Sequence, residues 1–567
     1  MNPSTSFAVR GSSGINVFLG PSKFEPDQTF NNVISKFCRL MVFSPCGDYF
    51  AYHNGTALHL LKTRKWETIV VIENTKCYHL NFSPKGTYLC SWEPFIVNNA
   101  NPQGSPNLHL YKTENGKLIT SFVQKKQNNW EPIWSCDELL FSRLVNNNIV
   151  FYDLESFNTI QKVNAYKVLS YSMSPTVGSY YLVCHTQGGS GQPSIGRLFK
   201  YPSFENQQSV ANKSFFQCDK VEFYWHTKGT HVLLLTMTEV DKTGGSYYGK
   251  QGLHFISTSG ETAMVTMNKD GPIYSVAWSP KAMEFCVVYG FMPARASIFN
   301  IKCEIAYEFS AAPRNSIYYN PFGNILLLAG FGNLRGHIEL WDTNTKKLIG
   351  NCEAPDTTLL QWSPDGIHFL TATTAPRLRI GNGYKIWHYT GALIHEQMYP
   401  NEELYEVLWQ TVSNGTFKES ALTCQKVEGI VPSVPQPSKE AYRPPSARNR
   451  PAIQFKLHDD DDSTPIRPNS GAPSKAAIKQ KKKRENKKAR NQEEKDMTVN
   501  PPITSNVTVV LTGDEEKDKK IKNIKKKLDA IAKLKDQQAQ GKILEINQIS
   551  KIKGEGELIA ELNTLQI

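Results

Sequence analysis

Residues 82–92 read FSPKGTYLCSW, and this stretch combines a turn with a strand. Proline and glycine two residues apart favour a tight turn, because proline presets φ and glycine tolerates a left-handed backbone. The residues that follow, YLCSW, are rich in strand-forming side chains. The stretch therefore predicts a turn that joins two β-strands.

The same pattern, which we call an anchor, recurs along the chain. Clear copies are FSPCG at 43, FSPKG at 82, MSPTVG at 173, WSPKA at 278, YNPFG at 319 and WSPDG at 362, and weaker copies are WSCDE at 134, WHTKG at 225 and WQTVSNG at 409. Successive anchors start 39 to 53 residues apart. A period of roughly 40 to 45 residues is typical of four-stranded propeller blades, with longer gaps absorbed by loops.

The repeat predicts an all-β fold, a WD-type β-propeller over residues 1–425. The nine anchors leave the count open between eight and nine blades, because the first eight anchors are the firmer ones and propellers usually have about four to eight blades. Only Trp341-Asp342 keeps the literal Trp-Asp pair, so a search for that pair alone would undercount the blades. The β-rich segment before residue 36 is predicted to supply the strand that closes the ring.

The charge of the 567-residue chain is concentrated near its C-terminus. The formal net charge is +12, and the windows 475–490 and 517–535 contribute +8 and +7, which leaves −3 for the rest. A nearly neutral body with a basic tail indicates a polyanionic partner, with nucleic acid ahead of membrane. The alternative is a solvated tail that only keeps the protein soluble.

Composition changes after residue 425. Prolines and charged runs predict a disordered Pro-rich and Lys-rich linker over 426–512. Over 513–567, isoleucines and leucines at helical spacing predict a basic α-helical hairpin. The hairpin explains the apolar stripe but not the lysines opposite it, which are suited to phosphate backbones. The predicted RNA-binding residues are Lys481, Lys482, Lys483, Arg484, Lys487, Lys488, Arg490, Lys519, Lys520, Lys522, Lys525, Lys526 and Lys527.

Two glycine-rich stretches come close to nucleotide-binding motifs without matching them. AGFGNLRG, residues 329–336, lacks the dinucleotide spacing and precedes a strand, so no helix N-terminus is present to hold a phosphate. GGSYYGKQ, residues 244–251, has Gln251 where a phosphate loop needs Ser or Thr. Both are predicted to be inter-strand loops.

No catalytic or cofactor motif is recognisable, so the chain is predicted not to be an enzyme and to need no cofactor or metal. An enzyme with its active site in the propeller channel is the rival hypothesis. The eleven cysteines contain no C-x-x-C pair, and neither a signal peptide nor a membrane-spanning run is apparent. These features predict free thiols and a cytoplasmic location.

Several long stretches resemble a known family. They are GPIYSVAWSP at 271, EFCVVYGFMPARASIFN at 284, LAGFGNLRGHIELWD at 328, LTATTAPRLRIGNGYKIWHYTG at 370 and the tail from 518 to 552. The chain resembles the eukaryotic translation initiation factor 2A family essentially from end to end. The resemblance implies nine blades rather than eight.

The resemblance also implies a non-enzymatic factor that binds the small ribosomal subunit and promotes delivery of initiator methionyl-tRNA without its own GTPase. Messenger RNA and other initiation factors are further expected partners, whereas DNA and membranes are not expected. On the propeller, Arg335, Arg377 and Arg379 lie in distinctive loops and are candidate RNA contacts, with pairing to carboxylates of adjacent blades as the alternative. The alternative function is a WD-repeat scaffold for protein complexes whose tail serves solubility or localisation.

Overall fold

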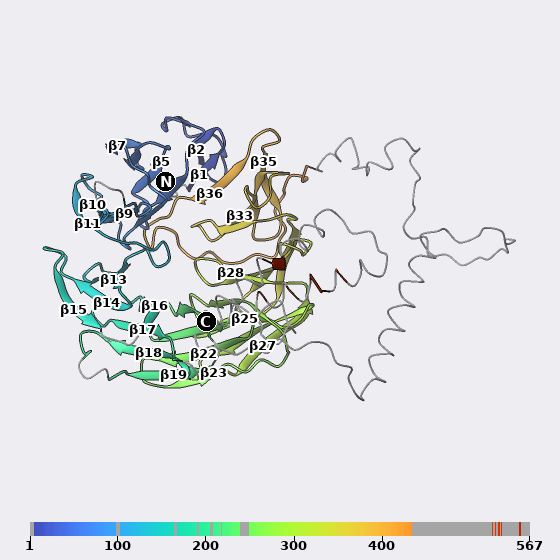
Figure 1. The fold of residues 1–567 in the computed structure, drawn as a ribbon. Helices are drawn as coiled ribbons and strands as arrows, with labels where there is room; N and C mark the ends of the chain where they lie inside the picture. The colour runs from blue at the N-terminus through green and yellow to red at the C-terminus, as the bar shows by residue number, and fades with distance from the viewer. Residues whose placement is uncertain are drawn as a thin grey trace, which may run out of the picture. The chain divides into compact units, whose positions relative to one another are not determined.

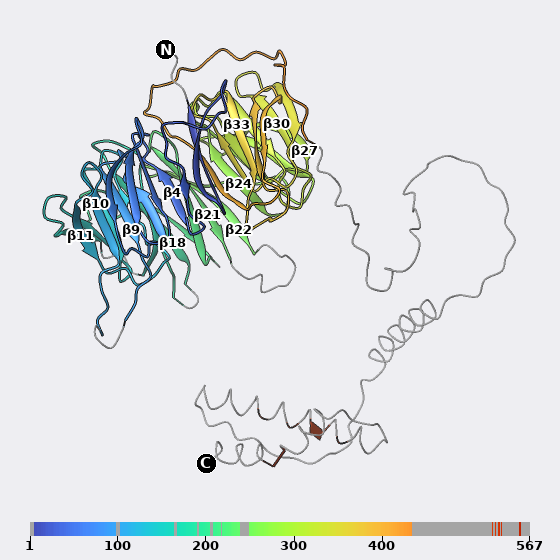
Figure 2. The same ribbon diagram turned by 90° about the horizontal axis from the view of Figure 1, so that it is seen from above.

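The computed structural model describes residues 5–97, 102–163, 167–189, 192–204, 208–216, 218–238 and 249–433, together with residues 524, 528, 531, 532, 535, 555 and 556. The chain divides into two units, Met1–Pro445 and Ser446–Ile567. The first unit contains nine four-stranded antiparallel sheets, which follow one another around a ring (Figures 1 and 2). The prediction of an all-β, nine-bladed propeller is confirmed.

Eight blades are formed by consecutive strands, named in order from the innermost strand outward. Blade 1 is β4 (Leu40–Phe43), β5 (Tyr49–His53), β6 (Leu58–Lys62) and β7 (Glu67–Ile72); blade 2 is β8 (His79–Phe82), β9 (Tyr88–Trp92), β10 (Leu108–Lys112) and β11 (Leu118–Phe122); blade 3 is β12 (Ile133–Trp134), β13 (Phe141–Val145), β14 (Asn148–Tyr152) and β15 (Thr159–Val163). Blade 4 is β16 (Val168–Met173), β17 (Tyr181–Thr186), β18 (Ser194–Lys200) and β19 (Ala211–Phe215); blade 5 is β20 (Lys220–Trp225), β21 (His231–Met237), β22 (Gln251–Ser257) and β23 (Thr262–Met264). Blade 6 is β24 (Ile273–Trp278), β25 (Glu284–Tyr289), β26 (Ala294–Asn300) and β27 (Ile305–Ala312); blade 7 is β28 (Ser316–Tyr319), β29 (Ile325–Ala329), β30 (His337–Asp342) and β31 (Leu348–Glu353); blade 8 is β32 (Leu359–Trp362), β33 (His368–Thr373), β34 (Gly383–His388) and β35 (Leu393–Met398).

Blade 9 combines the two ends of the propeller sequence. Its innermost strand is β36 (Leu404–Trp409), followed by β1 (Ser6–Gly11), β2 (Gly14–Leu19) and β3 (Val33–Ile34). The N-terminal segment therefore closes the ring as predicted, but it supplies three strands rather than one. In the β1–β36 pair, Phe7 lies opposite Trp409.

Each anchor ends an innermost strand, and its side chains explain why the pattern recurs. Ser83 accepts a hydrogen bond from the Tyr88 amide at 2.9 Å, and Asn320 accepts one from the Ile325 amide at 3.0 Å. The anchor glycines adopt the left-handed backbone that the turn requires, as at Gly86 with φ +79°. We call the side of the ring that carries the anchor turns the anchor face.

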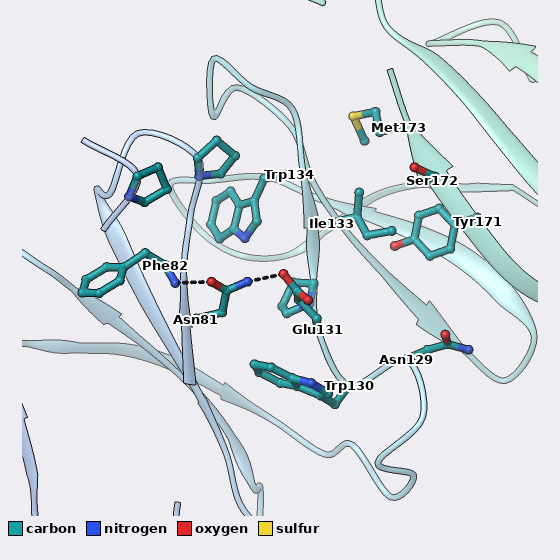
Figure 3. A pocket seen from close by; sticks show the side chains of 13 residues that line it. Asn81, Phe82, Asn129, Trp130, Glu131, Ile133, Trp134, Tyr171, Ser172 and Met173 are labelled. Atoms are coloured by element: carbon teal, nitrogen blue, oxygen red, sulfur yellow. Dashed lines mark hydrogen bonds between the residues drawn. The ribbon is translucent and has the colours of Figure 1, made fainter. Parts of the chain in front are cut away.

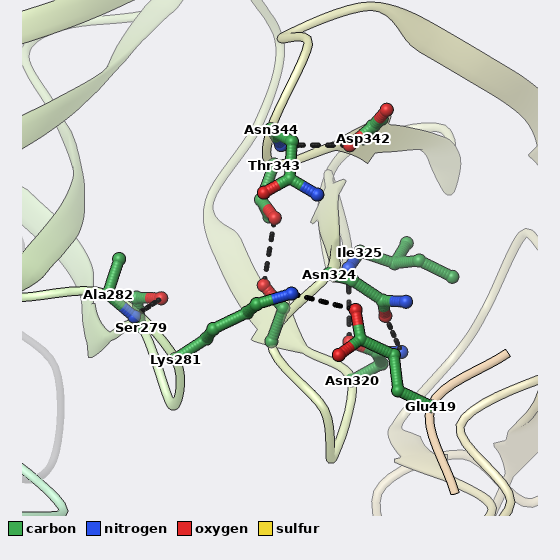
Figure 4. A network of polar contacts seen from close by, with 11 residues as sticks. Ser279, Lys281, Ala282, Asn320, Asn324, Ile325, Asp342, Thr343, Asn344 and Glu419 are labelled. Carbon is green, nitrogen blue, oxygen red and sulfur yellow. Dashed lines mark hydrogen bonds and ion pairs between the residues drawn. The ribbon is translucent and has the colours of Figure 1, made fainter. Parts of the chain in front are cut away.

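Residues 410–433 continue from β36 across the anchor face. The Gln410 amide donates to the Ser6 carbonyl at 2.8 Å, which fixes the start of the segment beside β1. Farther on, Glu419 forms a 2.8 Å ion pair with Lys281 in the anchor turn of blade 6; Figure 4 shows this pair together with the Asn320–Asn324 hydrogen bond of blade 7. The Ile430 amide then donates to the Leu393 carbonyl of β35 at 2.7 Å. The segment thus bridges blades that are far apart in the ring.

In the second unit, few residues are described. Ile524, Leu528 and Ile531 are helical, and Ile524 and Ile531 are buried. Lys535 forms an ion pair with Glu555, which is also helical. The extent of the helical hairpin, the linker and the boundaries at 425 and 512 stay predictions. Among the helical residues that the structure describes, none belong to a helix long and apolar enough to cross a membrane.

Candidate RNA interface on the loop face

The three predicted propeller arginines lie on one side of the ring. Arg335 is in the β29–β30 loop of blade 7, and Arg377 and Arg379 are in the β33–β34 loop of blade 8. These loops join the second and third strands of a blade, so they lie at the opposite end of the strands from the anchor turns. We call this side the loop face. All three side chains are exposed.

The structure brings two of these loops into contact. A side chain added at Gly332 would lie 3.4 Å from the Arg377 guanidinium. A cavity of 240 Å³ between blades 7 and 8 is lined by Arg377 and by polar and aromatic side chains, among them Asn315, Tyr318 and Phe331. Within the described part of the chain, Arg335 and Arg377 have no ion pair, whereas Arg379 pairs with Glu403 at 3.4 Å. Arg379 thus has the cross-blade pairing that was the alternative to RNA contact.

The glycines of the AGFGNLRG loop allow the backbone conformation and close packing of the loop itself. Gly332 and Gly336 have φ of +74° and +82°. The Gly336 amide donates to the Gly330 carbonyl at 2.9 Å, so the loop closes on itself. A Cβ at Gly336 would lie 2.2 Å from the Ala354 carbonyl oxygen. The prediction of an inter-strand loop is confirmed.

A second group of cations on the loop face was missed by sequence reasoning. A cavity of 290 Å³ is lined by Arg10, Lys36, Phe37, Cys38, Arg39 and Tyr405. These residues come from β1, from the β3–β4 connection and from β36, which meet only because the ring closes there. The local sequence KFCR, residues 36–39, places an aromatic side chain between two cations and was the available signal.

A cavity of 660 Å³ with aromatic walls lies beside the innermost strands β8, β12 and β16 (Figure 3). Glu131 lies between Trp130 and Trp134 and accepts a hydrogen bond from Asn81. Burial raises the pKa of Glu131, and the Asn81 hydrogen bond opposes that shift. The residues that line this cavity include one carboxylate and no His, Cys, Lys or Arg. Acid–base or nucleophilic catalysis usually relies on paired groups, so this cavity supports no specific reaction.

Potential metal ligands are dispersed over the propeller. The residues that the structure describes contain no group of three or more His, Cys, Asp or Glu side chains placed to hold a metal ion. The described cysteines are all free thiols. The thirteen predicted RNA-binding residues of the tail lie outside the described residues.

His185 provides a test of the buried core. It is fully buried in β17, and neither ring nitrogen has a hydrogen-bond partner among the described residues. Burial lowers the pKa of His185 from 6.5 to about 4. As the pH falls below about 6.5, His185 is therefore protonated in the unfolded chain but stays neutral in the folded protein. The folded protein loses stability between that pH and about pH 4.

The unfolding free energy of the wild-type protein should fall as the pH is lowered from about 7 to about 5. In His185→Leu, we expect this fall to be smaller by about 2 kcal/mol. Urea unfolding of the wild-type and variant proteins at both pH values measures this difference. An unchanged pH dependence would show that His185 is not held neutral by the fold.

Comparisons with known proteins cover both the propeller and the tail. Residues 213–407 match the family described as eukaryotic translation initiation factor eIF2A. The chain is 38% identical to eukaryotic translation initiation factor 2A of Drosophila melanogaster, over 99% of this chain and 98% of that protein. It is 33% identical to the protein of the same name from Schizosaccharomyces pombe, over 100% of this chain and 99% of that protein.

A solved structure described as the crystal structure of the eukaryotic initiation factor is 32% identical in sequence to this chain and superposes with a TM-score of 0.66. The match covers 73% of this chain and 100% of the chain in that structure. The full-length similarity extends beyond the propeller to the basic tail. The chain belongs to the eukaryotic translation initiation factor 2A family.

Proposed function

We propose that the chain is a cytoplasmic, non-enzymatic translation initiation factor that binds the small ribosomal subunit and promotes delivery of initiator methionyl-tRNA without a GTPase of its own. The observation that carries this proposal is the similarity to initiation factor 2A proteins along the whole chain. The propeller offers a rigid platform, since its nine blades close through pairing of the two ends of its sequence. Messenger RNA and other initiation factors are further partners under this proposal.

The basic tail supplies the salt-sensitive part of RNA binding in this proposal. Its two windows contribute +8 and +7, against −3 for the rest of the chain. Each lysine that neutralises a phosphate releases condensed counterions, so binding weakens as salt increases. Binding through protein contacts alone, as in the scaffold alternative, would depend much less on salt.

Neutralising Lys525, Lys526 and Lys527 to Gln is expected to weaken binding to purified small subunits about tenfold. The slope of log affinity against log salt, measured between about 50 and 200 mM, should fall by roughly two to three. A matched control replaces three exposed anchor-face lysines, Lys117, Lys228 and Lys302, with Gln. The control should change neither value, and an unchanged slope in the tail variant would remove those lysines from the interface.

Delivery is tested separately by retention of initiator methionyl-tRNA on small subunits in the absence of GTP. The full-length protein should increase retention of initiator tRNA, and elongator tRNA should not respond. Equal retention of both tRNAs, or a requirement for GTP, would contradict the proposed function. Subunit binding that survives nuclease treatment and is insensitive to salt would favour the scaffold alternative.

A further inference from the structure

An exposed aromatic and cationic surface spans blade 1 on the loop face, from the connection that enters blade 1 to the connection that leaves it for blade 2. It is formed by Lys36, Phe37 and Arg39 before β4 and by Tyr78 before β8, and we call these four residues the KFRY patch. Phe37 is 71% exposed and Tyr78 is 47% exposed. Arg10 and Tyr405 line the adjoining 290 Å³ cavity together with Lys36, Phe37 and Arg39. Exposed apolar surface of this kind is typical of an interaction site.

The exposed Phe37 is held in place by its backbone. Its amide donates to the Ser35 hydroxyl at 3.2 Å, and that hydroxyl donates to the Asn54 carbonyl at 2.9 Å. A Cβ at Gly55, which has φ +111°, would lie 2.4 Å from the Phe37 Cβ, so the β5–β6 loop packs directly beneath this residue. The ring is therefore presented on a fixed support, which lowers the entropic cost of binding.

The two cations that flank Phe37 in the sequence have no ion-pair partner in the part of the chain that the structure describes. Lys36 and Arg39 are exposed and have no ion pair among the residues that the structure describes. The Arg39 guanidinium lies 5.4 Å from the centre of the Tyr78 ring. The neighbouring acid Glu406 is already paired with Arg10 at 3.1 Å, and Arg10 also donates to the Cys38 carbonyl at 3.2 Å. Two cations thus remain available on either side of an exposed aromatic ring.

Single-stranded RNA matches this combination better than an apolar protein surface does. An apolar partner would cover Phe37 but leave Lys36 and Arg39 desolvated and unpaired. Single-stranded RNA offers base faces that stack on aromatic rings and phosphates that pair with cations. An RNA duplex keeps its base faces stacked inside the helix and cannot use the ring in this way.

We propose that the KFRY patch binds single-stranded RNA, with bases stacked on Phe37 and Tyr78 and phosphates paired with Lys36 and Arg39. The inference deepens the proposed function, on which it rests, by giving the propeller its own RNA-binding site separate from the tail. The KFRY patch is expected to bind single-stranded RNA of any sequence, because every nucleotide has a base that can stack and a phosphate that can pair with a cation.

Photocrosslinking to the full-length protein tests the proposal, because it reports binding at the patch even when the tail also binds RNA. The probe is a single-stranded RNA of about 12 nucleotides that carries 4-thiouridine, and crosslinked peptides are mapped by mass spectrometry. Peptides with Phe37 and Tyr78 should be crosslinked. Lys36→Gln/Arg39→Gln should reduce this yield about tenfold, and Phe37→Ala should reduce the yield at Tyr78 similarly, with recovery in Phe37→Trp.

The matched control is Arg64→Gln/Lys65→Gln, which removes two exposed cations from the β6–β7 turn on the anchor face of blade 1. It should leave the yield unchanged. Absence of crosslinks at both peptides, an undiminished yield in Lys36→Gln/Arg39→Gln, or an equal yield with duplex RNA would overturn the inference. Binding of the protein to small ribosomal subunits, measured in parallel, distinguishes the two proposals. If the protein binds subunits but shows no crosslinks at the KFRY patch, only the RNA-binding role of the patch is overturned. If the patch is crosslinked but the protein does not bind subunits, only the proposed function is overturned.

Discussion

Replacing Phe7 with alanine is expected to destabilise the propeller by about 3–5 kcal/mol, the usual effect of removing a fully buried aromatic ring. Phe7 is fully buried in β1. Its ring centre lies 5.2 Å from that of Trp409, 5.4 Å from that of Phe18 and 5.4 Å from that of Tyr384. Trp409 belongs to β36, the innermost strand of blade 9, and Tyr384 belongs to blade 8, so the cavity would open where the ring closes.

Equilibrium unfolding in urea measures the effect. The control is Phe37→Ala, because Phe37 is 71% exposed and surface substitutions usually change stability by less than about 0.5 kcal/mol. A loss below about 1 kcal/mol in Phe7→Ala would show that blades 8 and 9 repack around the missing ring. In that event, the hydrogen bonds between β1 and β36, rather than the aromatic cluster, would hold the ring closed.

The propeller was largely predictable from sequence because its anchors act locally. In blades 1 and 2, for example, the turn uses a Ser side chain that accepts a hydrogen bond from a nearby amide and a glycine with positive φ, and both are visible in a five-residue pattern. The weak anchor of blade 3 shows where the pattern fails. Glu138 replaces the glycine with φ +58°, and its carboxylate accepts a hydrogen bond from the Lys85 amide at 2.6 Å. This hydrogen bond to blade 2 thus offsets the cost of placing a residue other than glycine at a positive φ.

Features that depend on distant segments were less predictable. Blade 9 takes three strands from the N-terminus, and the path of residues 410–433 across the anchor face follows from contacts such as Lys281–Glu419, for which the sequence carries no local pattern. Arg335 and Arg377 could be chosen from the sequence as candidate RNA contacts because the sequences of their loops are distinctive. For the KFRY patch, the sequence KFCR was a local signal, but no sequence pattern links it to Tyr78 of the next blade or to its support at Gly55.

Replacing Arg314 with methionine is expected to cost about 3–5 kcal/mol, because it leaves the largely buried Glu339 carboxylate without its ion-pair partner. The Arg314 side chain is 3% exposed and that of Glu339 is 13% exposed, and their charged groups are 2.8 Å apart. The pair joins the segment between blades 6 and 7 to β30. Lys220→Met is the control: the Lys220–Glu222 pair, with side chains 62% and 38% exposed, should contribute less than about 1 kcal/mol.

The double variant Arg314→Met/Glu339→Met separates the value of the pair from the penalty of breaking it. Replacing both charges with apolar side chains removes both desolvation costs, so the double variant should recover much of the stability lost in Arg314→Met. Recovery should be incomplete, because the Trp341 indole N–H donates to Glu339 at 3.0 Å and would lose its acceptor. Urea unfolding of Arg314→Met, Glu339→Met and the double variant measures this coupling. A double variant less stable than Arg314→Met would mean that Glu339 stabilises blade 7 through Trp341 rather than through Arg314.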